Sequence, residues 1–196
     1  MTRGRPKTFD DTEVLERAMQ VFWRQGYEAT SLEDLVDAME IPRQSLYRTF
    51  TDKHTLFLRA LEHYDANVTS IVIQTLNGEG AAITNLKSLF ELWNRSVTSS
   101  SRMGCLMVNT AAQVSQSDSR VAKIVNANQM RLVKAIEKCV QRAQFEGDVD
   151  SSIDPKIAAR TLSATVNGLM CMSRAGVAKS FKTDVLAGLP SIVGIK

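Results

Sequence analysis

Residues 30–53 read TSLEDLVDAMEIPRQSLYRTFTDK, and this stretch predicts two short helices, a tight turn between them and the start of a third helix. Ser31 and Asp34 have the S-x-x-D spacing of a capping pair at a helix N-terminus. Thr30 with Glu33, one residue earlier, is the alternative capping pair. The two alternatives place the start of the first helix one residue apart.

A break separates the two short helices. The apolar residues of the first helix recur at intervals of three and four and give it a single apolar face, formed by Leu32, Leu35, Val36 and Met39. Glu40 and Ile41 then lead to Pro42, which cannot continue a helix but suits the first turn of a new one. A helix-turn-helix arrangement follows from this pattern.

The second short helix has a polar surface without acidic residues. Its polar side chains are Arg43, Gln44, Ser45, Arg48 and Thr49. Leu46 and Phe50 are four residues apart and face inward with Ile41. In a DNA major groove, Arg pairs with guanine and Gln pairs with adenine. The helix is therefore either a recognition helix for double-stranded DNA or a solvated amphipathic helix, and its surroundings favour the first interpretation.

Length and composition set wide bounds. The chain has 196 residues, enough for one domain or two small ones, and its 44% hydrophobic content is that of an ordinary globular protein. No apolar run reaches the ~18 residues that a membrane span requires. The N-terminal sequence lacks the apolar segment of a signal peptide, so we expect a cytoplasmic protein that does not enter a membrane.

Basic charge is concentrated at the N-terminus although the net charge is only +3. Arg3, Arg5 and Lys7 form an arm without acidic residues. Arg3-Gly4-Arg5-Pro6 has the form of a minor-groove tripeptide extended by proline, and such an arm can place guanidinium groups in A·T-rich DNA. The alternative is a disordered basic tail that adds non-specific attraction.

Helical periodicity continues along the whole chain, and no strand-like alternation interrupts it. We expect an all-α protein of about nine helices. Besides the two short helices, the expected ranges are 11–25, 52–76, 81–99, 104–115, 118–146, 154–175 and 181–188. The helix at 52–76 is long enough to link an N-terminal head to the remaining helices.

Cysteine and histidine usage argues against a metal site, a bound cofactor and a catalytic site. Cys105, Cys139 and Cys171 are odd in number and widely spaced, so they form neither a disulfide framework nor a zinc signature. His54 and His63 lie on one helix without a neighbouring ligand or nucleophile. An all-helical enzyme or small-molecule-binding protein with an incidental basic head is the alternative to a DNA-binding regulator.

The first third of the chain resembles the tetracycline-repressor (TetR/AcrR-like) family of bacterial transcriptional regulators. The residues that carry the resemblance are Thr30-Ser31, Leu46-Tyr47, Phe50-Thr51-Asp52-Lys53 and Leu56. The remainder of the chain matches the family in layout. The resemblance implies a DNA-binding head at residues 1–53 and a helical ligand-binding and dimerisation body at residues 54–196.

The family pattern assigns roles to single residues of the head. Thr30, Tyr47 and Lys53 correspond to phosphate contacts, and residues 43–49 correspond to the recognition helix. The sequence departs from the pattern at Glu40, where glycine is usual, so a non-glycine residue is expected at positive φ. Position 49, often an aromatic residue in the family, is a threonine here.

The body is expected to bind a small-molecule effector. Residues 103–110 are nearly uncharged and too apolar for a surface helix, and methionine suits an adaptable apolar pocket. The candidate pocket residues are Phe90, Trp93, Met103, Cys105, Met107, Asn109, Met130 and Met170. The alternative is that these side chains fill the core. Cys105, expected in the first turn of a helix, is either a reactive thiol or a packing residue.

The last two helices are expected to form a homodimer interface, as the resemblance implies. Small residues among large apolar ones let two helices approach closely, and the candidate contacts are Leu162, Thr165, Gly168, Leu169, Met172 and Leu186. Two heads in a dimer match a palindromic operator. The sequence thus predicts a dimeric repressor that a small apolar molecule or an electrophile releases from DNA.

Overall fold

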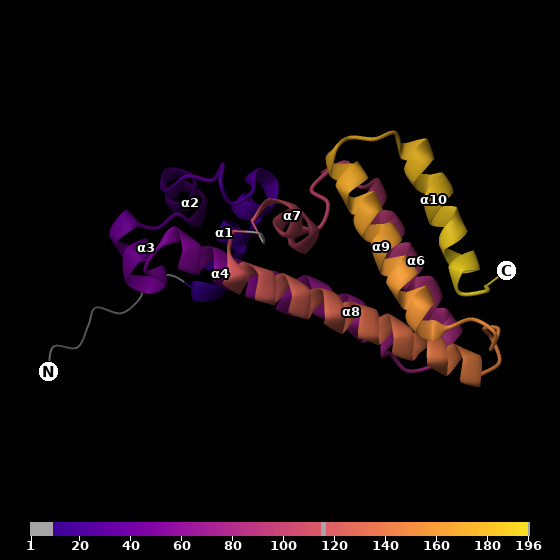
Figure 1. The fold of residues 1–196 in the computed structure, drawn as a ribbon. Helices are drawn as coiled ribbons and strands as arrows, with labels where there is room; N and C mark the ends of the chain where they lie inside the picture. Colours follow the sequence, from indigo (N-terminus) through magenta and orange to yellow (C-terminus); the bar gives the residue numbers. More distant parts are fainter. Residues whose placement is uncertain (1–9, 115–116, 196) are drawn as a thin grey trace, which may run out of the picture. The chain divides into compact units, whose positions relative to one another are not determined.

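The computed structural model describes residues 10–114 and 117–195, and these ranges contain helices and no strand. The predicted all-α fold is confirmed. The chain divides into two compact units, Met1–Tyr64 and Asp65–Lys196, which we call the head and the body. Figure 1 shows the helices of each unit, coloured along the sequence.

In the head, local capping fixes the first two helices. The described part of the head contains α1 (Asp11–Gln25), α2 (Leu32–Met39), α3 (Arg43–Phe50) and α4 (Lys53–Tyr64). Asp10 caps α1 by accepting a hydrogen bond from the Thr12 N–H at 2.8 Å. At the start of α2, the Ser31 hydroxyl accepts from the Asp34 N–H, and the Asp34 carboxylate accepts from the Ser31 N–H. The capping pair is therefore Ser31 and Asp34.

Aromatic side chains tie α4 to α1. Phe57 of α4 lies with its ring centroid 4.9 Å from that of Phe22 and 4.7 Å from that of Tyr27. All of α4 consequently belongs to the head, whereas the sequence predicted a boundary after Lys53. The structure places the division after Tyr64, because the inner face of α4 is buried against α1.

The long helix expected at 52–76 is interrupted. After α4 comes a π-helical turn, η1 (Asp65–Thr69), followed by α5 (Ser70–Leu76). The Ser70 hydroxyl donates to the Asp65 carbonyl at 3.1 Å, and such a side-chain bond competes with regular helical pairing. Single π-helical turns of this kind insert an extra residue into a helix. The prediction of one uninterrupted helix was therefore wrong.

The other helices of the body are α6 (Ala82–Thr98), α7 (Leu106–Gln113), α8 (Ser119–Phe145), α9 (Pro155–Arg174) and α10 (Lys179–Ile192). Asp118 and Asp154 cap α8 and α9 through their side chains. Helix α7 is shorter than expected, because Gly104 has a φ of +64° and Cys105 is the N-cap residue. Helix α10 is longer than expected and includes Pro190.

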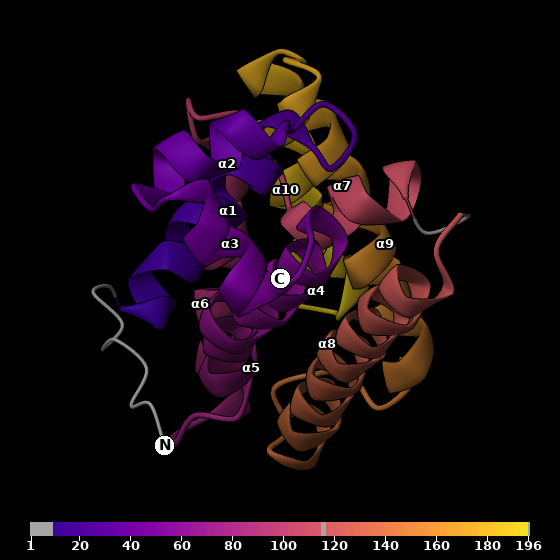
Figure 2. The same ribbon diagram turned by 90° about the vertical axis from the view of Figure 1, so that its left-hand side faces the viewer.

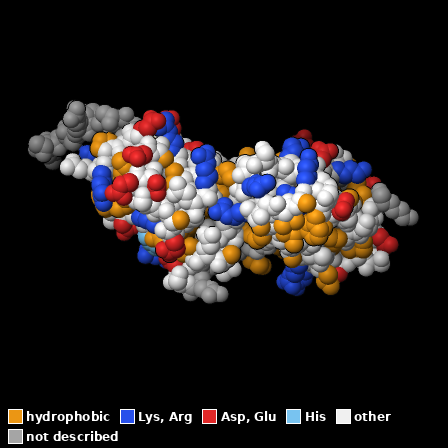
Figure 3. Space-filling model, turned by 90° about the horizontal axis from the view of Figure 1, so that it is seen from above, with side chains coloured by type: hydrophobic (Ala, Val, Ile, Leu, Met, Phe, Trp, Pro, Cys, Tyr) orange, Lys and Arg blue, Asp and Glu red, His pale blue; other side chains and the backbone are white. Residues whose placement is uncertain are grey.

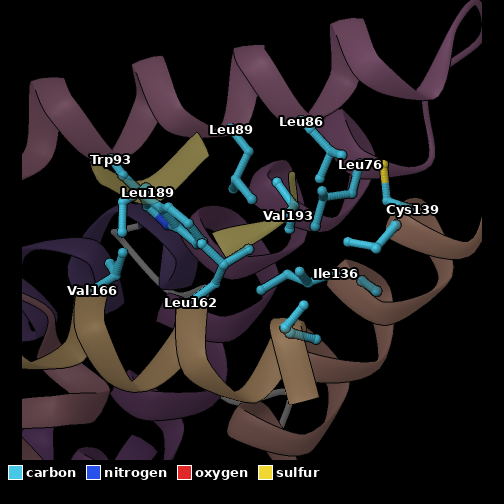
Figure 4. Close-up of a cluster of buried hydrophobic side chains, with 14 of the residues drawn as sticks. Leu76, Leu86, Leu89, Trp93, Ile136, Cys139, Leu162, Val166, Leu189 and Val193 are labelled. Atoms are coloured by element: carbon cyan, nitrogen blue, oxygen red, sulfur yellow. The ribbon is translucent and has the colours of Figure 1, made fainter. Parts of the chain in front are cut away.

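One hydrophobic core joins α5, α6, α8, α9 and α10. Figure 4 shows its side chains pointing toward one another, among them Leu76, Leu89, Ile136, Leu162 and Leu189. Helices α8 and α9, which both contribute side chains to this core, lie next to each other (Figure 2). Across the described ranges, none of the helices combines the length and apolarity needed to cross a membrane. Those ranges also hold no group of three or more His, Cys, Asp or Glu side chains able to bind a metal ion.

Candidate nucleic-acid interface

The turn before α3 has the predicted positive φ. Glu40 adopts a left-handed conformation with φ 54° and ψ 38°. Arg17 of α1 pairs with the Glu40 carboxylate at 2.7 Å and also with Glu13 at 2.8 Å. A left-handed non-glycine residue costs ~1–2 kcal/mol, which an ion pair of this kind partly offsets. The turn is thus held from α1 as well as by its own backbone.

Buried anchors set the orientation of α3. Pro42 is the N-cap residue, and Leu46 and Phe50 are 0% and 1% exposed. Their burial turns the opposite side of the helix outward, where Arg43 and Gln44 are exposed. The exposed residues further along this outer side are Tyr47 and Arg48. Helix α3 therefore presents two arginines, an amide and a phenol to solvent.

Two of the predicted contact residues point elsewhere. Thr30 is only 1% exposed, and its hydroxyl donates to the Gly26 carbonyl at 2.6 Å, so this side chain is used inside the head. The Thr49 hydroxyl oxygen is also shielded from solvent and has no hydrogen-bond partner among the described residues. The side chains of these two threonines are therefore removed from the candidate DNA contacts.

Arg43 has partners that the sequence did not predict. Its Nη1 atom donates to Glu33 Oε1 of α2 at 2.7 Å. Its guanidinium carbon lies 5.9 Å from the centroid of the Tyr47 ring. A hydrogen bond to Tyr47 and electrostatic interaction with Tyr47, followed by the charge of Glu33, raise the pKa of Arg43 above its ordinary value. The sequence predicts for Glu33 only a role in the alternative capping pair with Thr30.

Lys53 begins α4 beside an aromatic ring. Its ammonium nitrogen lies 4.5 Å from the centroid of the Tyr27 ring, a cation–π geometry. Asp52 caps the same helix by accepting from the Thr55 N–H at 2.6 Å. Helix α4 therefore starts with a positive side chain in a defined position. The predicted arm residues Arg3, Arg5 and Lys7 lie outside the described residues.

The candidate effector residues fall into three groups. Trp93, Met107, Asn109 and Met170 are buried, whereas Phe90, Met103 and Cys105 are half-buried. Met130 is 60% exposed, so it does not belong to the core, and its part in a pocket stays a prediction. It lies on the outer side of α8, between residues whose polar groups reach neighbouring helices.

Most of the segment before α7 is packed against α9. The Asn109 side-chain amide donates to the Met103 carbonyl at 2.9 Å, and an Arg174 Nη1 atom donates to the same carbonyl at 3.3 Å. A Cβ atom on Gly104 would lie 2.8 Å from the Met170 carbonyl oxygen. Glycine is therefore required there both by its positive φ and by this close approach. Met103, Asn109 and Met170 therefore lie close together around Gly104, and their part in an effector pocket stays a prediction.

The candidate dimer residues are divided between core and surface. Leu162, Leu169 and Leu186 are buried within the body, so they are core residues and their assignment to an interface was wrong. A Cβ atom on Gly168 would meet nothing within 4 Å, and Met172 is 37% exposed. Thr165 is half-buried, and its hydroxyl donates to the Thr161 carbonyl at 2.8 Å.

The outer side of α9 continues from Gly168 in both directions. Besides Gly168, where an added Cβ atom would have free space, the exposed residues on this side recur at helical spacing. They are Ile157, Thr161, Ala164, Cys171 and Met172. Phe181 of α10 is also 45% exposed. We call these seven residues the α9–α10 face. Figure 3 shows hydrophobic side chains gathered on the body.

Polar side chains between helices of the body were missed by sequence reasoning. The Asn128 amide of α8 donates to Asp65 Oδ1 at 2.6 Å and to the Thr69 hydroxyl at 2.8 Å. Arg131 pairs with the same Asp65 carboxylate. These contacts join α8 to η1, residues about sixty positions apart along the chain, and no local pattern predicts them.

The sequence of the chain is similar to those of known DNA-binding regulators. The family model of the bacterial regulatory proteins of the tetR family matches residues 14–60, and the tetracyclin repressor-like C-terminal domain matches residues 82–182. The HTH-type transcriptional repressor ComR of Escherichia coli (strain K12) is 30% identical over 177 residues, which cover 89% of this chain and 84% of ComR.

The structure of the chain is also similar to solved structures. The regulator CifR, a cysteine mutant solved in complex with a 26-bp double-strand operator DNA, is 29% identical, with a TM-score of 0.81 over 96% of this chain and 98% of CifR. The reduced form of NemR from E. coli is 19% identical, with a TM-score of 0.83 over 95% of this chain and 99% of NemR, and shares the fold. The chain therefore belongs to the tetR family of bacterial regulatory proteins.

Proposed function

We propose that this protein is a homodimeric transcriptional repressor that binds a palindromic DNA operator and leaves it when an effector binds the body. The observation that carries the proposal is the outer side of α3, where Arg43, Gln44 and Arg48 are exposed on a helix anchored by buried apolar residues. The similarity to CifR, which was solved on operator DNA, and to the repressor ComR supports it.

Sequence-specific binding can be tested without knowing the operator. The protein would be used to select duplexes from a random pool, and the affinity for the enriched sequence would be measured by fluorescence anisotropy. We expect a palindrome with two half-sites about one helical turn apart or a multiple of that distance. Failure to enrich any sequence over repeated rounds would contradict the proposal.

For the effector, we propose a small apolar molecule or an electrophile that binds next to residues 103–107. Met103 and Cys105 are half-buried in this segment, and Cys105, like the half-buried Phe90 of α6, packs against the core of the body. The half-buried Cys105 sulfur could add to a ring carbon of a quinone: a sulfur–carbon bond forms as a ring C=C π bond breaks, and the thiol proton passes to the quinone oxygen, which gives a hydroquinone thioether.

The quinone test separates a reactive thiol from a packing residue. Quinone treatment should lower the operator affinity of the wild type, whereas Cys105→Ser should keep its affinity. Cys171→Ser is the matched control, because it removes a thiol of α9, on the α9–α10 face, and keeps Cys105, and it should respond like the wild type. If all three proteins respond alike, the quinone does not act through Cys105.

A further inference from the structure

Glu33 is a carboxylate placed beside the recognition residue Arg43. Its Oε1 atom accepts from Arg43 Nη1 at 2.7 Å, with the two side chains 67% and 55% exposed. The acidic neighbours Asp34 and Glu40 are engaged within the scaffold: Asp34 closes the capping box of α2, and Glu40 pairs with Arg17. Glu33 differs from them because its partner is a residue that we assign to DNA.

We infer that Glu33 is a specificity-determining positioning residue, which holds Arg43 against Tyr47 so that the guanidinium group addresses a base edge and not a phosphate. The inference rests on the proposed binding of DNA through α3. Glu33 belongs to α2, so it is not among the residues on the outer side of α3.

The donor geometry of arginine supports this role. A guanidinium group carries five N–H donors in a fixed planar fork. Glu33 accepts one of these donors, from Nη1, and Tyr47 accepts another, which leaves three N–H donors, enough for two further acceptors. Guanine presents such a pair, O6 and N7, in the major groove. The Tyr47 ring, 5.9 Å from the guanidinium carbon, limits movement on another side of Arg43.

The charge of Glu33 also supports this role. Any DNA sequence attracts a solvated arginine through its phosphates, and this attraction carries no sequence information. A carboxylate next to Arg43 neutralises that attraction and repels the backbone, whereas hydrogen bonds to a base edge remain available. An exposed ion pair contributes little to folding, which makes a purely structural role a weak explanation for Glu33.

The test uses Glu33→Gln, which removes the charge and keeps the size of the side chain. Affinities would be measured for the duplex selected by the wild type and for a scrambled duplex of equal length and composition. Glu33→Gln should bind the scrambled duplex more tightly, with a salt slope steeper by about 0.9 for one added phosphate contact. The ratio of the two affinities should fall by at least about threefold as base discrimination by Arg43 is lost.

Two further variants give the experiment its controls. Glu28→Gln removes the same charge from an exposed position between α1 and α2 and should leave the affinity ratio nearer to that of the wild type. In an Arg43→Ala background, Glu33→Gln should no longer change the ratio, whereas a structural role for Glu33 would change it in both backgrounds.

The outcomes separate the inference from the proposed function. If the wild type does not distinguish the two duplexes, the proposed function fails. If it distinguishes them and Glu33→Gln keeps the wild-type ratio, or changes it equally with and without Arg43, the positioning role is overturned. Thermal unfolding of each variant shows that the head is folded in every comparison.

Discussion

Gln44 and Lys53 lie in different surroundings, and the proposed interface gives them different contacts. Gln44 is exposed near the start of α3, where it can read a base, whereas Lys53 begins α4 over the Tyr27 ring. Gln44→Ala should weaken operator binding by about 1–3 kcal/mol and leave binding to random DNA nearly unchanged. Anisotropy titrations on both duplexes measure this difference.

Lys53→Ala should affect both duplexes, in contrast to Gln44→Ala. It should weaken binding to operator and random DNA by the same factor and make the salt slope shallower by about one, because it removes a phosphate contact. An equal loss on both duplexes for Gln44→Ala would instead place Gln44 among the phosphate contacts.

Cys139 predicts a pH dependence of stability. It is 3% exposed, and burial raises the pKa of its thiol from 9.0 to about 11. Above pH 9.0 the unfolded chain therefore loses a proton that the folded chain retains up to about pH 11, so the free energy of unfolding falls as pH rises through this window. Cys139→Ala should flatten this decrease in thermal melts.

Val140→Ala supplies the control for that measurement. It truncates a buried neighbour that carries no thiol, so it should keep the wild-type slope of melting temperature against pH. Because other groups titrate in the same pH range, the contribution of Cys139 is the difference in this slope between the variants. An identical slope for Cys139→Ala and wild type would show that burial does not perturb this thiol.

At the scale of secondary structure elements, η1 depends on one side chain of α8. Asn128 is 6% exposed and donates to both Asp65 and Thr69. Asn128→Ala leaves these groups without that donor and should lower the free energy of unfolding by about 1–3 kcal/mol. Urea denaturation measures the loss, and the exposed neighbour Asn126→Ala should change little. A loss equal to that of Asn126→Ala would mean that α5 and α8 hold the turn without this contact.

Helix positions were predictable where local chemistry decides them. The Ser31–Asp34 capping box, Gly26 after α1 and Asp154-Pro155 at α9 are short-range signals, and the structure has each of them. The π-helical turn was not predictable, because it is accompanied by contacts to Asn128 far along the chain.

In the candidate nucleic-acid interface, too, contacts between different helices were not predictable from the sequence. The sequence predicted which residues of α3 are polar, and burial of Leu46 and Phe50 confirmed which side of the helix faces inward. It did not predict the ion pair from Glu33, nor the burial of Thr30, since both depend on how α2 packs. Among the expected interface residues, helical spacing alone did not separate the core side of α9 from its outer side.

For the whole molecule, we expect a dimer built on the α9–α10 face. Substitution at Gly168 tests it, because a Cβ atom there meets nothing within 4 Å and the single chain can accept a larger residue. Gly168→Arg should yield folded monomers, since a charged side chain would obstruct a close helix contact. Operator affinity should fall steeply because the two heads are no longer linked.

Light scattering and band shifts measure the two effects of that substitution. Asn94→Arg adds the same charge at an exposed position of α6 and should remain dimeric. A dimer that survives Gly168→Arg would place the interface on another surface of the body.

The two tryptophans give the protein a built-in optical readout of its two units. Trp23 of the head lies edge-on to Tyr64, with ring centroids 5.0 Å apart, whereas Trp93 is 5% exposed in the core of the body. Trp23→Phe would leave tryptophan fluorescence from the body alone, and Trp93→Phe would leave tryptophan fluorescence from the head alone. The emission spectra of these two variants would therefore report, without any added dye, whether head and body melt together or in sequence.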